Sequence, residues 1–353
     1  MEKKSLKSRI GFILFAFAGI LLVLVIFIHC FGSKTALNIS LSTLFGFAHF
    51  YAFPILFGMA GACFFLVIIA ILAWRFARGH KPSRWAVCLC TALLIAFTAF
   101  ALFGGNAKRP AAAGHSGRAC RFVAWNALDQ FDRHSAKAIF LDFDADIAVL
   151  PEFGAYVKGE DVRQRVEDIF AEAGIKADAY DVFTSRLFAG RIAPVTIIVK
   201  RDFATYEPME EDGVMTVFGT LYLHSATKGI PDIIGLHTSP PIPGIWTSMS
   251  LWKRDINLIA DMASVHKSAI IAGDFNATMR HGPLNTITTH YDALETLSPF
   301  QRGTWPAKLP AVFRTSIDHI LLPDTCSVKS VETRKMDSSD HAAIFSELII
   351  NAE

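Results

Sequence analysis

Acidic residues are almost absent from the first third of this 353-residue chain. After Glu2 no aspartate or glutamate occurs before Asp129, although the same stretch holds 13 of the 34 lysines and arginines. From residue 129 onward there are 21 basic and 31 acidic residues, so the net charge of +2 averages two unlike halves. With 52% hydrophobic and only 19% charged residues, the composition excludes a wholly soluble protein and a disordered one.

Charged residues of either sign are missing from three stretches: residues 10–33, 35–74 and 85–107. A helix needs about 20 apolar residues to cross the hydrocarbon core of a bilayer. The first and third stretches fit one span each, and residues 45–74 fit one tilted span with a kink at Pro54. A cleaved signal peptide is disfavoured because the first apolar run is too long and no Ala-x-Ala-like site follows it. Residues 1–107 are therefore predicted to form a three-helix transmembrane anchor.

Basic residues predict the orientation of this anchor. Eight of them lie before the first span or between the second and third: Lys3, Lys4, Lys7, Arg9, Arg75, Arg78, Lys81 and Arg84. The loop between the first and second spans has only Lys34. Because cytoplasmic loops are enriched in lysine and arginine, the N-terminus is predicted to be cytoplasmic. Everything beyond about Lys108 is then outside the plasma membrane, although Lys108 and Arg109 oppose this with two charges against eight.

Cysteine is scarce outside the anchor, where only Cys120 and Cys326 occur. An extracytoplasmic compartment allows a disulfide between them. The sequence does not show whether they are close, so a disulfide and two separate thiols both stay open.

Several phosphate- and metal-binding motifs are also absent. The chain has no Gly-rich phosphate loop, no Cys/His spacing typical of zinc sites and no GxSxG nucleophile elbow. These absences leave the competing hydrolase classes without support.

Beyond a Gly/Ala/Pro-rich linker, residues 108–119, the pattern is that of one α/β domain over residues 120–350. Strand-sized apolar runs are predicted at 121–125, 147–150, 195–199, 233–236, 270–272 and 317–322. Two amphipathic helices and one hairpin turn are predicted at 162–173, 252–265 and Asp212-Gly213.

Polar residues stand at the ends of these strands, where a site on an α/β scaffold is expected. They are Asn126, Glu152, His237, Asp274, Asn276, Asp318, Asp340 and His341.

The segments that hold these residues resemble, in the same order, the motifs of the endonuclease/exonuclease/phosphatase superfamily, whose fold is DNase I-like. They are WN (125–126), DADIAVLPE (144–152), GLHT (235–238), GDFNAT (273–278), TSIDHIL (315–321) and SSDH (338–341). One such segment recurs by chance, whereas six in order over residues 120–348 are specific. With the three spans, HTSPP (237–241) and GTWPA (303–307), the chain is similar to the membrane-anchored branch that includes the teicoplanin-resistance membrane proteins of actinobacteria. The resemblance implies a four-layer α/β sandwich behind the anchor.

The resemblance also implies a metal site for hydrolysis of phosphate esters. Hard oxygen ligands select Mg²⁺ or Mn²⁺. Glu152 is expected to be the primary ligand, with Asn126 and Asp340 supporting it or a second ion.

The other five residues are expected to be catalytic. Asp274 would orient and activate the attacking water, and Asn276 would hold a phosphate oxygen. His341, oriented by Asp318, would face the scissile phosphate. His237 would stabilise the phosphate or protonate the leaving oxygen.

Neighbouring residues have simpler interpretations. His319 points to the opposite strand face from the residue before it, which favours packing. Residues 142–146 mimic the opening of a calcium loop, but Ile147 and Phe153 replace its glycine and glutamate, so a solvated turn is expected. Trp305 either lines the site or anchors a loop.

The fold alone leaves the substrate open. We favour a membrane-anchored phosphoesterase acting on a phosphate ester or pyrophosphate at the outer membrane face, with a lipid-linked substrate. Residues 108–120 reach at most about 45 Å, which keeps the site near the bilayer. The net charge of −10 beyond residue 128 does not favour nucleic acid. The alternatives are an extracytoplasmic endonuclease or exonuclease acting on DNA or RNA, and a non-catalytic binding protein.

Overall fold

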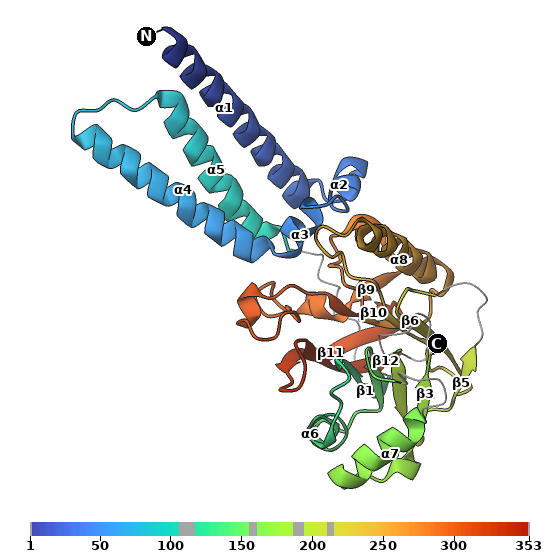
Figure 1. Cartoon of the computed structure of the whole chain (residues 1–353). Coiled ribbons are helices and arrows are strands. Elements are labelled where there is room, and N and C mark those ends of the chain that lie inside the picture. Colours follow the sequence, from blue (N-terminus) through green and yellow to red (C-terminus); the bar gives the residue numbers. More distant parts are fainter. Residues whose placement is uncertain (1, 106–116, 155–160, 186–193, 210–214, 352–353) are drawn as a thin grey trace. The chain divides into compact units, whose positions relative to one another are not determined.

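The computed structural model describes residues 2–105, 117–154, 161–185, 194–209 and 215–351. The chain divides into two compact units, Met1–Asn106 and Ala107–Glu353, and each has its own hydrophobic core. Figure 1 shows the first unit in blue and teal and the second in green to red.

The first unit contains three long helices: α1 (Glu2–Phe31), α4 (Pro54–Ala77) and α5 (Arg84–Phe103). Two short helices, α2 (Ala36–Leu41) and α3 (Phe47–Ala52), lie between α1 and α4 in the chain. Three segments are long and apolar enough to cross a membrane: Ile13–Phe31, Pro54–Ala77 and Arg84–Phe103. Helices α4 and α5 pack closely at Gly58. A Cβ added at this glycine would lie only 2.5 Å from the backbone nitrogen of Ala101, so the absence of a side chain allows the approach.

The second candidate span begins later than the sequence predicts. The prediction was one helix over residues 45–74 with a kink at Pro54, but α3 ends at Ala52 and Phe53 has non-helical angles (φ −121°, ψ 60°). Proline restricts the residue before it and has no N–H to donate, so Pro54 starts a new helix instead of bending an existing one.

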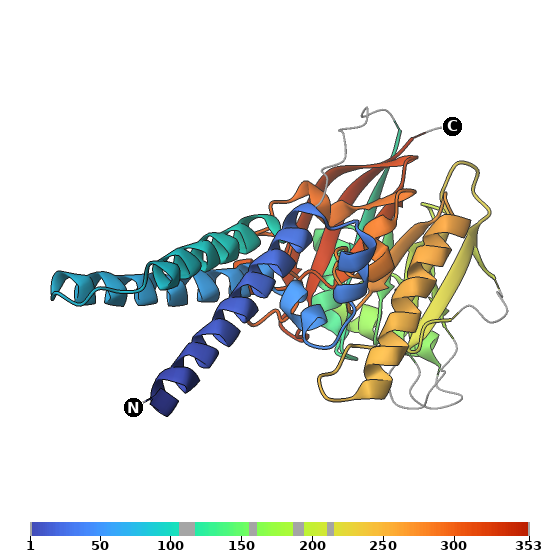
Figure 2. The ribbon, with the colours of Figure 1, turned by 90° about the horizontal axis from the view of Figure 1, so that it is seen from above.

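The second unit is built on two six-stranded sheets (Figures 1 and 2). The first has the order β11 (Cys326–Lys335), β12 (Ala342–Ile350), β1 (Arg118–Ala124), β2 (Ile147–Leu150), β4 (Thr196–Lys200) and β3 (Tyr180–Thr184). The second has the order β5 (Tyr206–Met209), β6 (Gly219–Ser225), β7 (Ile233–His237), β8 (Ile270–Asp274), β10 (Asp318–Pro323) and β9 (His290–Asp292).

Helices cover the outer faces of these sheets. Helices α6 (Arg133–Lys137) and α7 (Val162–Ala173) pack on the first sheet, and α8 (Trp246–Val265) lies along the second (Figures 1 and 2). Short helical turns occur at Ala138–Asp142, Ala177–Ala179, Gly282–Thr286, Ala293–Thr296 and Ala311–Phe313. The predicted α/β sandwich of four layers is confirmed.

Alternating side chains in the strands explain the layers. In β1, Phe122 and Ala124 belong to the core between the sheets, whereas Val123 packs beneath the helices. In β2, Val149 likewise belongs to the core between the sheets and Ala148 packs beneath the helices. Successive strand residues point to opposite faces, so a sheet covered on both sides needs continuous apolar runs.

Most predicted elements occur within one to three residues of their predicted bounds, and α7 has the predicted bounds. Helix α8 begins six residues earlier than predicted, at Trp246. Strands β5 and β6 pair as a hairpin, but the predicted turn at residues 212–213 lies outside the described residues. Most of the predicted linker, residues 108–119, also lies outside them, and β1 begins at Arg118.

Cys120 and Cys326 are both buried free thiols. Cys120 pairs with Leu348 and Cys326 with Ile350, so β12 lies between the two cysteines. Two strand spacings amount to about 9.5 Å, which exceeds the Cα separation of a disulfide.

Candidate active site

The site lies where strands of both sheets end. Strands β1 and β2 are parallel, and so are β7 and β8, so the residues that follow each pair emerge on one edge. Asn126 and Glu152 come from the first pair, and His237 and Asp274 are register partners in the second.

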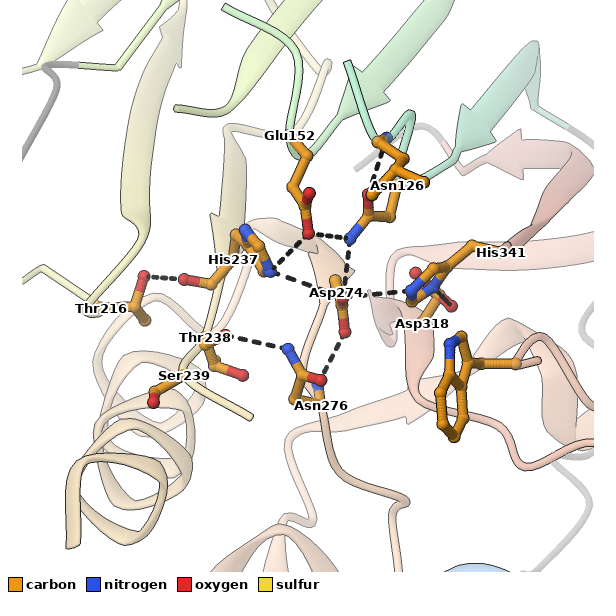
Figure 3. A network of polar contacts seen from close by, with 12 residues as sticks. Asn126, Glu152, Thr216, His237, Thr238, Ser239, Asp274, Asn276, Asp318 and His341 are labelled. Atoms are coloured by element: carbon orange, nitrogen blue, oxygen red, sulfur yellow. Dashed lines mark hydrogen bonds and ion pairs between the residues drawn. The ribbon is translucent and has the colours of Figure 1, made fainter. Parts of the chain in front are cut away.

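Two antiparallel strands complete the site from the other direction. Asp318 opens β10 as the register partner of Asp274, and His341 immediately precedes β12, which pairs with β1. The predicted residues that converge in this network, shown in Figure 3, are Asn126, Glu152, His237, Asp274, Asn276, Asp318 and His341.

Asn126 joins the two halves of the site. Its Nδ2 donates to Glu152 Oε1 at 3.0 Å and to Asp274 Oδ2 at 2.9 Å, while its Oδ1 accepts the Leu128 N–H at 3.0 Å. Its oxygen is therefore occupied by backbone, and in this structure Asn126 holds two carboxylates together. The prediction that it supports a metal ion stays a prediction.

His341 and Asp318 form the predicted pair, with His341 Nδ1 2.9 Å from Asp318 Oδ2. The other ring nitrogen, Nε2, lies 3.8 Å from Asp274 Oδ2. Burial alone would lower the pKa of His341, but the carboxylates of Asp318 and Asp274 outweigh it and raise the pKa to about 10. The two carboxylates thus favour the protonated form of His341 at neutral pH.

His237 is the opposite case. Its Nε2 lies 3.5 Å from Glu152 Oε1 and 3.6 Å from Asp274 Oδ2. Full burial, together with the positive charge of His341, lowers the pKa of His237 to about 3. A neutral imidazole can donate one hydrogen bond or bind a metal, but it is a poor source of a proton for a leaving group.

The acidic residues are crowded. Burial raises the pKa of Glu152. Burial, and next the Asp318 charge, raise the pKa of Asp274 to about 7. A carboxylate with a pKa near neutrality is suited to accept a proton from water.

Asn276 positions Asp274. Its backbone N–H donates to Asp274 Oδ1 at 2.8 Å, and its Nδ2 donates to the carbonyl of Thr238 at 2.9 Å. The predicted contact of Asn276 with a phosphate oxygen is not tested by these bonds.

Asp340 lies at the rim of the site. Its Oδ2 accepts the indole N–H of Trp305 at 2.9 Å, and its Oδ1 is 4.0 Å from His341 Nε2. Trp305 therefore contacts a predicted site residue. The sequence left open whether it lines the site or anchors a loop.

Backbone conformation at the site is unusual. Glu152 and Asn276 have positive φ angles of 55° and 45°, although neither is glycine. Gly273 has φ 140°, and a Cβ there would lie 2.0 Å from the Leu236 carbonyl oxygen. The glycine before Asp274 is therefore required by the close approach of β7.

The sequence interpretation missed two supporting contacts. Ser339 donates its hydroxyl to the Asn126 carbonyl at 2.7 Å and accepts the His341 N–H at 3.1 Å. His319, interpreted as a packing residue, is buried between Asp292 Oδ2 at 2.7 Å and the Ala277 carbonyl at 2.8 Å. The serine lies within the SSDH segment, which was the only signal for it.

A model of the endonuclease/exonuclease/phosphatase family matches residues 123–341, more than half of the chain. The chain belongs to this family. The match includes every predicted site residue from Asn126 to His341. Enzymes of the endonuclease/exonuclease/phosphatase family hydrolyse phosphoester bonds, which makes this chain a member of a hydrolase family.

Solved structures share the fold. An AP endonuclease from Leishmania major aligns with a TM-score of 0.50 and 12% identity, covering 66% of this chain and 88% of that chain. An endonuclease/exonuclease/phosphatase from Bacteroides vulgatus aligns with a TM-score of 0.46 and 18% identity, covering 66% and 100%. A 3′-5′ exonuclease from Neisseria meningitidis aligns with a TM-score of 0.45 and 16% identity, covering 64% and 98%. Identities this low concern the fold alone, and no curated protein matches the sequence significantly.

Two residue groups in this family member fit a divalent cation: Glu152, His237 and Asp274, and Asp274, Asp318 and His341. In each group the candidate ligand atoms lie within 4.8 Å of one another. Asp318 Oδ1 is also buried and has no hydrogen-bond partner within the described part of the chain. Asp340 is in neither group. The first group fits better, because Asp318 and His341 already bond to each other.

Proposed function

We propose that this protein is a membrane-anchored, metal-dependent phosphoesterase that hydrolyses a phosphate ester or pyrophosphate at the outer membrane face. Its substrate would be lipid-linked and part of the cell envelope. The observation that supports this most is the cluster of Glu152, Asp274 and the His341–Asp318 pair, on a chain with three candidate membrane spans.

Each side chain of the site would have a separate role in hydrolysis. The imidazolium of His341, held by Asp318, would bind the non-bridging phosphate oxygens and oppose the charge that grows on them. Asp274, with its pKa near 7, would take the proton of the attacking water. Neutral His237 would donate its N–H to the substrate or bind the ion.

Glu152 is the residue that would hold Mg²⁺ or Mn²⁺, with His237 beside it, and Asp274 lies close enough to orient a water next to the ion. When bound, such an ion supplies positive charge to the phosphate and lowers the pKa of water. Asn126 keeps the two carboxylates together by donating to both.

Location and charge favour a lipid-linked substrate. The three candidate spans suggest membrane anchoring, and the charge asymmetry of their flanking segments favours an extracytoplasmic enzyme. The −10 net charge beyond residue 128 gives little electrostatic affinity for nucleic acid. The resemblance to teicoplanin-resistance membrane proteins agrees with an envelope substrate.

A substrate panel tests this proposal. Full-length protein in detergent, with Mg²⁺ or Mn²⁺, would be assayed on polyprenyl phosphates and pyrophosphates, phospholipids, and single- and double-stranded DNA. We expect phosphate or headgroup release from a lipid, and none from the His341→Ala variant. Fast DNA cleavage without release from any lipid would favour the extracytoplasmic nuclease instead.

A further inference from the structure

The loop that leads from the active site into α8 exposes apolar side chains. Ile242 is 44% exposed, Ile245 47% and Trp246 81%. Single exposed apolar residues are ordinary, but a group of them within five positions marks a contact surface. These three residues are called the loop tip below.

Hydrogen bonds hold the loop tip in this exposed position. The Ile242 N–H donates to Ser248 Oγ at 2.8 Å, and the Ile245 N–H donates to the Ile242 carbonyl at 3.3 Å. At the base of the loop, the Ser239 N–H donates to the buried carboxylate of Asp255 at 2.9 Å. The apolar side chains are thus presented by an ordered segment.

The base of the loop is part of the active site. The Thr238 N–H donates to the carbonyl of Asp274 at 3.0 Å, and its own carbonyl accepts from Asn276. The Trp252 indole, one and a half turns into α8, donates to the Asn276 carbonyl at 2.9 Å. Both sides of the loop are therefore fixed to the residues that position Asp274.

The chain segment that carries the loop tip has a composition that suits a lipid headgroup layer. No acidic residue occurs from residue 233 to residue 254. Lys253 and Arg254 follow about two turns beyond Trp246 in α8, where Arg254 donates to the Met215 carbonyl at 2.9 Å. Aromatic and aliphatic side chains beside basic ones are typical of segments that lie in the membrane interface. The nearest candidate span ends at Phe103, and the 14 residues before Arg118 reach at most about 50 Å.

We propose that Ile242, Ile245 and Trp246 insert into the lipid interface of the membrane in which the chain is anchored, and so bring the active site to lipid-linked phosphate. The choice of substrate rests on the proposed function, whereas the membrane contact does not. Tryptophan prefers the headgroup level of a bilayer, and the two isoleucines would bury their side chains just beneath it.

Fluorescence quenching measures the contact directly. Full-length protein would be placed in nanodiscs of phosphatidylcholine and phosphatidylglycerol, with and without bromine on the acyl chains. Trp74 and Trp85 of the first unit also contribute, so the Trp246 signal is the difference between the wild type and Trp246→Phe. We expect the brominated lipid to quench this difference signal.

Kinetics then separate membrane contact from catalysis. The double variant Ile245→Ser/Trp246→Ser should lower kcat/KM on a lipid phosphate in vesicles about tenfold, because the lost apolar burial weakens contact with the surface. Its activity on soluble bis(p-nitrophenyl) phosphate should not change. Val265→Ser is the matched control, since Val265 is 71% exposed at the opposite end of α8, about 28 Å along the helix.

The outcomes are distinguishable. If brominated lipid leaves the Trp246 signal unchanged, the proposal is overturned. This holds if an aqueous quencher reaches the indole, and it holds equally if protein or an added oligonucleotide shields it. Equal losses in the double variant and Val265→Ser also overturn it. Quenching without hydrolysis of any lipid supports the membrane contact and counts against the proposed function alone.

Discussion

Replacing Asp318 with asparagine tests the electrostatics of the site most directly. The substitution keeps the shape of the side chain and removes a negative charge 2.9 Å from His341 Nδ1. The pKa of His341 is about 10 in the native site, and among the groups that raise it Asp318 contributes most. One opposite charge at this distance raises a histidine pKa by about 1–3 units, so the variant should lower the pKa of His341 by that amount.

The expected effect has a definite sign. If protonated His341 binds the phosphate, activity is present below its pKa and is lost as pH rises through it. The alkaline limb of kcat/KM should therefore move down by about 1–3 pH units in Asp318→Asn. The rate on the acidic side should also fall, by about 10²–10⁴-fold, because the ring loses the partner that orients it.

The assay is a pH profile of kcat/KM from about pH 6 to about pH 11, on bis(p-nitrophenyl) phosphate with saturating metal, so that the wild-type limb near pH 10 lies inside the range. Asp292→Asn is the matched control, since Asp292 makes a similar buried contact of 2.7 Å with His319, outside the residues that face substrate. We expect that control to lose stability and keep the wild-type alkaline limb. An unchanged limb in Asp318→Asn, or equal shifts in the two variants, would refute the reasoning.

Four further results are expected. Glu152→Ala, or removal of metal by a chelator, should lower turnover at least about 10³-fold without loss of folding, as circular dichroism and initial rates would show. Gly273→Ala should lower the free energy of unfolding by about 3 kcal/mol or more, because φ 140° and a 2.0 Å clash force the backbone to move; a wild-type melting temperature would contradict this. Burial raises the pKa of Glu295 from 4.5 to about 8, so its ionisation should reduce stability as pH rises through that window; Glu295→Gln should raise the melting temperature at pH 8.5 and not at pH 4.5. A reporter active only outside the membrane, fused after Glu353, should give signal, whereas signal from a cytoplasm-only reporter would reverse the predicted orientation.

The sequence predicted the site through its strands. Glu152 and Asp274 each follow a short apolar run that is buried on both faces, and such runs are read with little ambiguity. Because parallel strands end on one edge, locating the strands places Glu152 beside Asn126 and His237 beside Asp274. These two pairs lie in different sheets, so only the resemblance indicated that they meet in one site. The pairing of His341 with Asp318 could be inferred only from the resemblance, since 23 residues separate them.

The orientation of the polar side chains in the site could not be predicted from the sequence. Whether Asn126 offers its oxygen or its nitrogen to the site depends on the Leu128 N–H, which a local backbone conformation places. The partner of Asp340 is an indole 35 residues away. Helix α8 was predicted to start too late because Trp246 is exposed at its first position, where an amphipathic pattern calls for a polar residue.

The left-handed conformation of Glu152 has a consequence for how this chain would evolve. Glycine adopts φ 55° without strain, and at this position it would also remove one of several crowded negative charges. An inactive chain with Gly at this position should therefore withstand heat better than the active one. A library selected only for thermal resistance would accumulate changes at Glu152 early, so any directed evolution of this protein must select for turnover in every round.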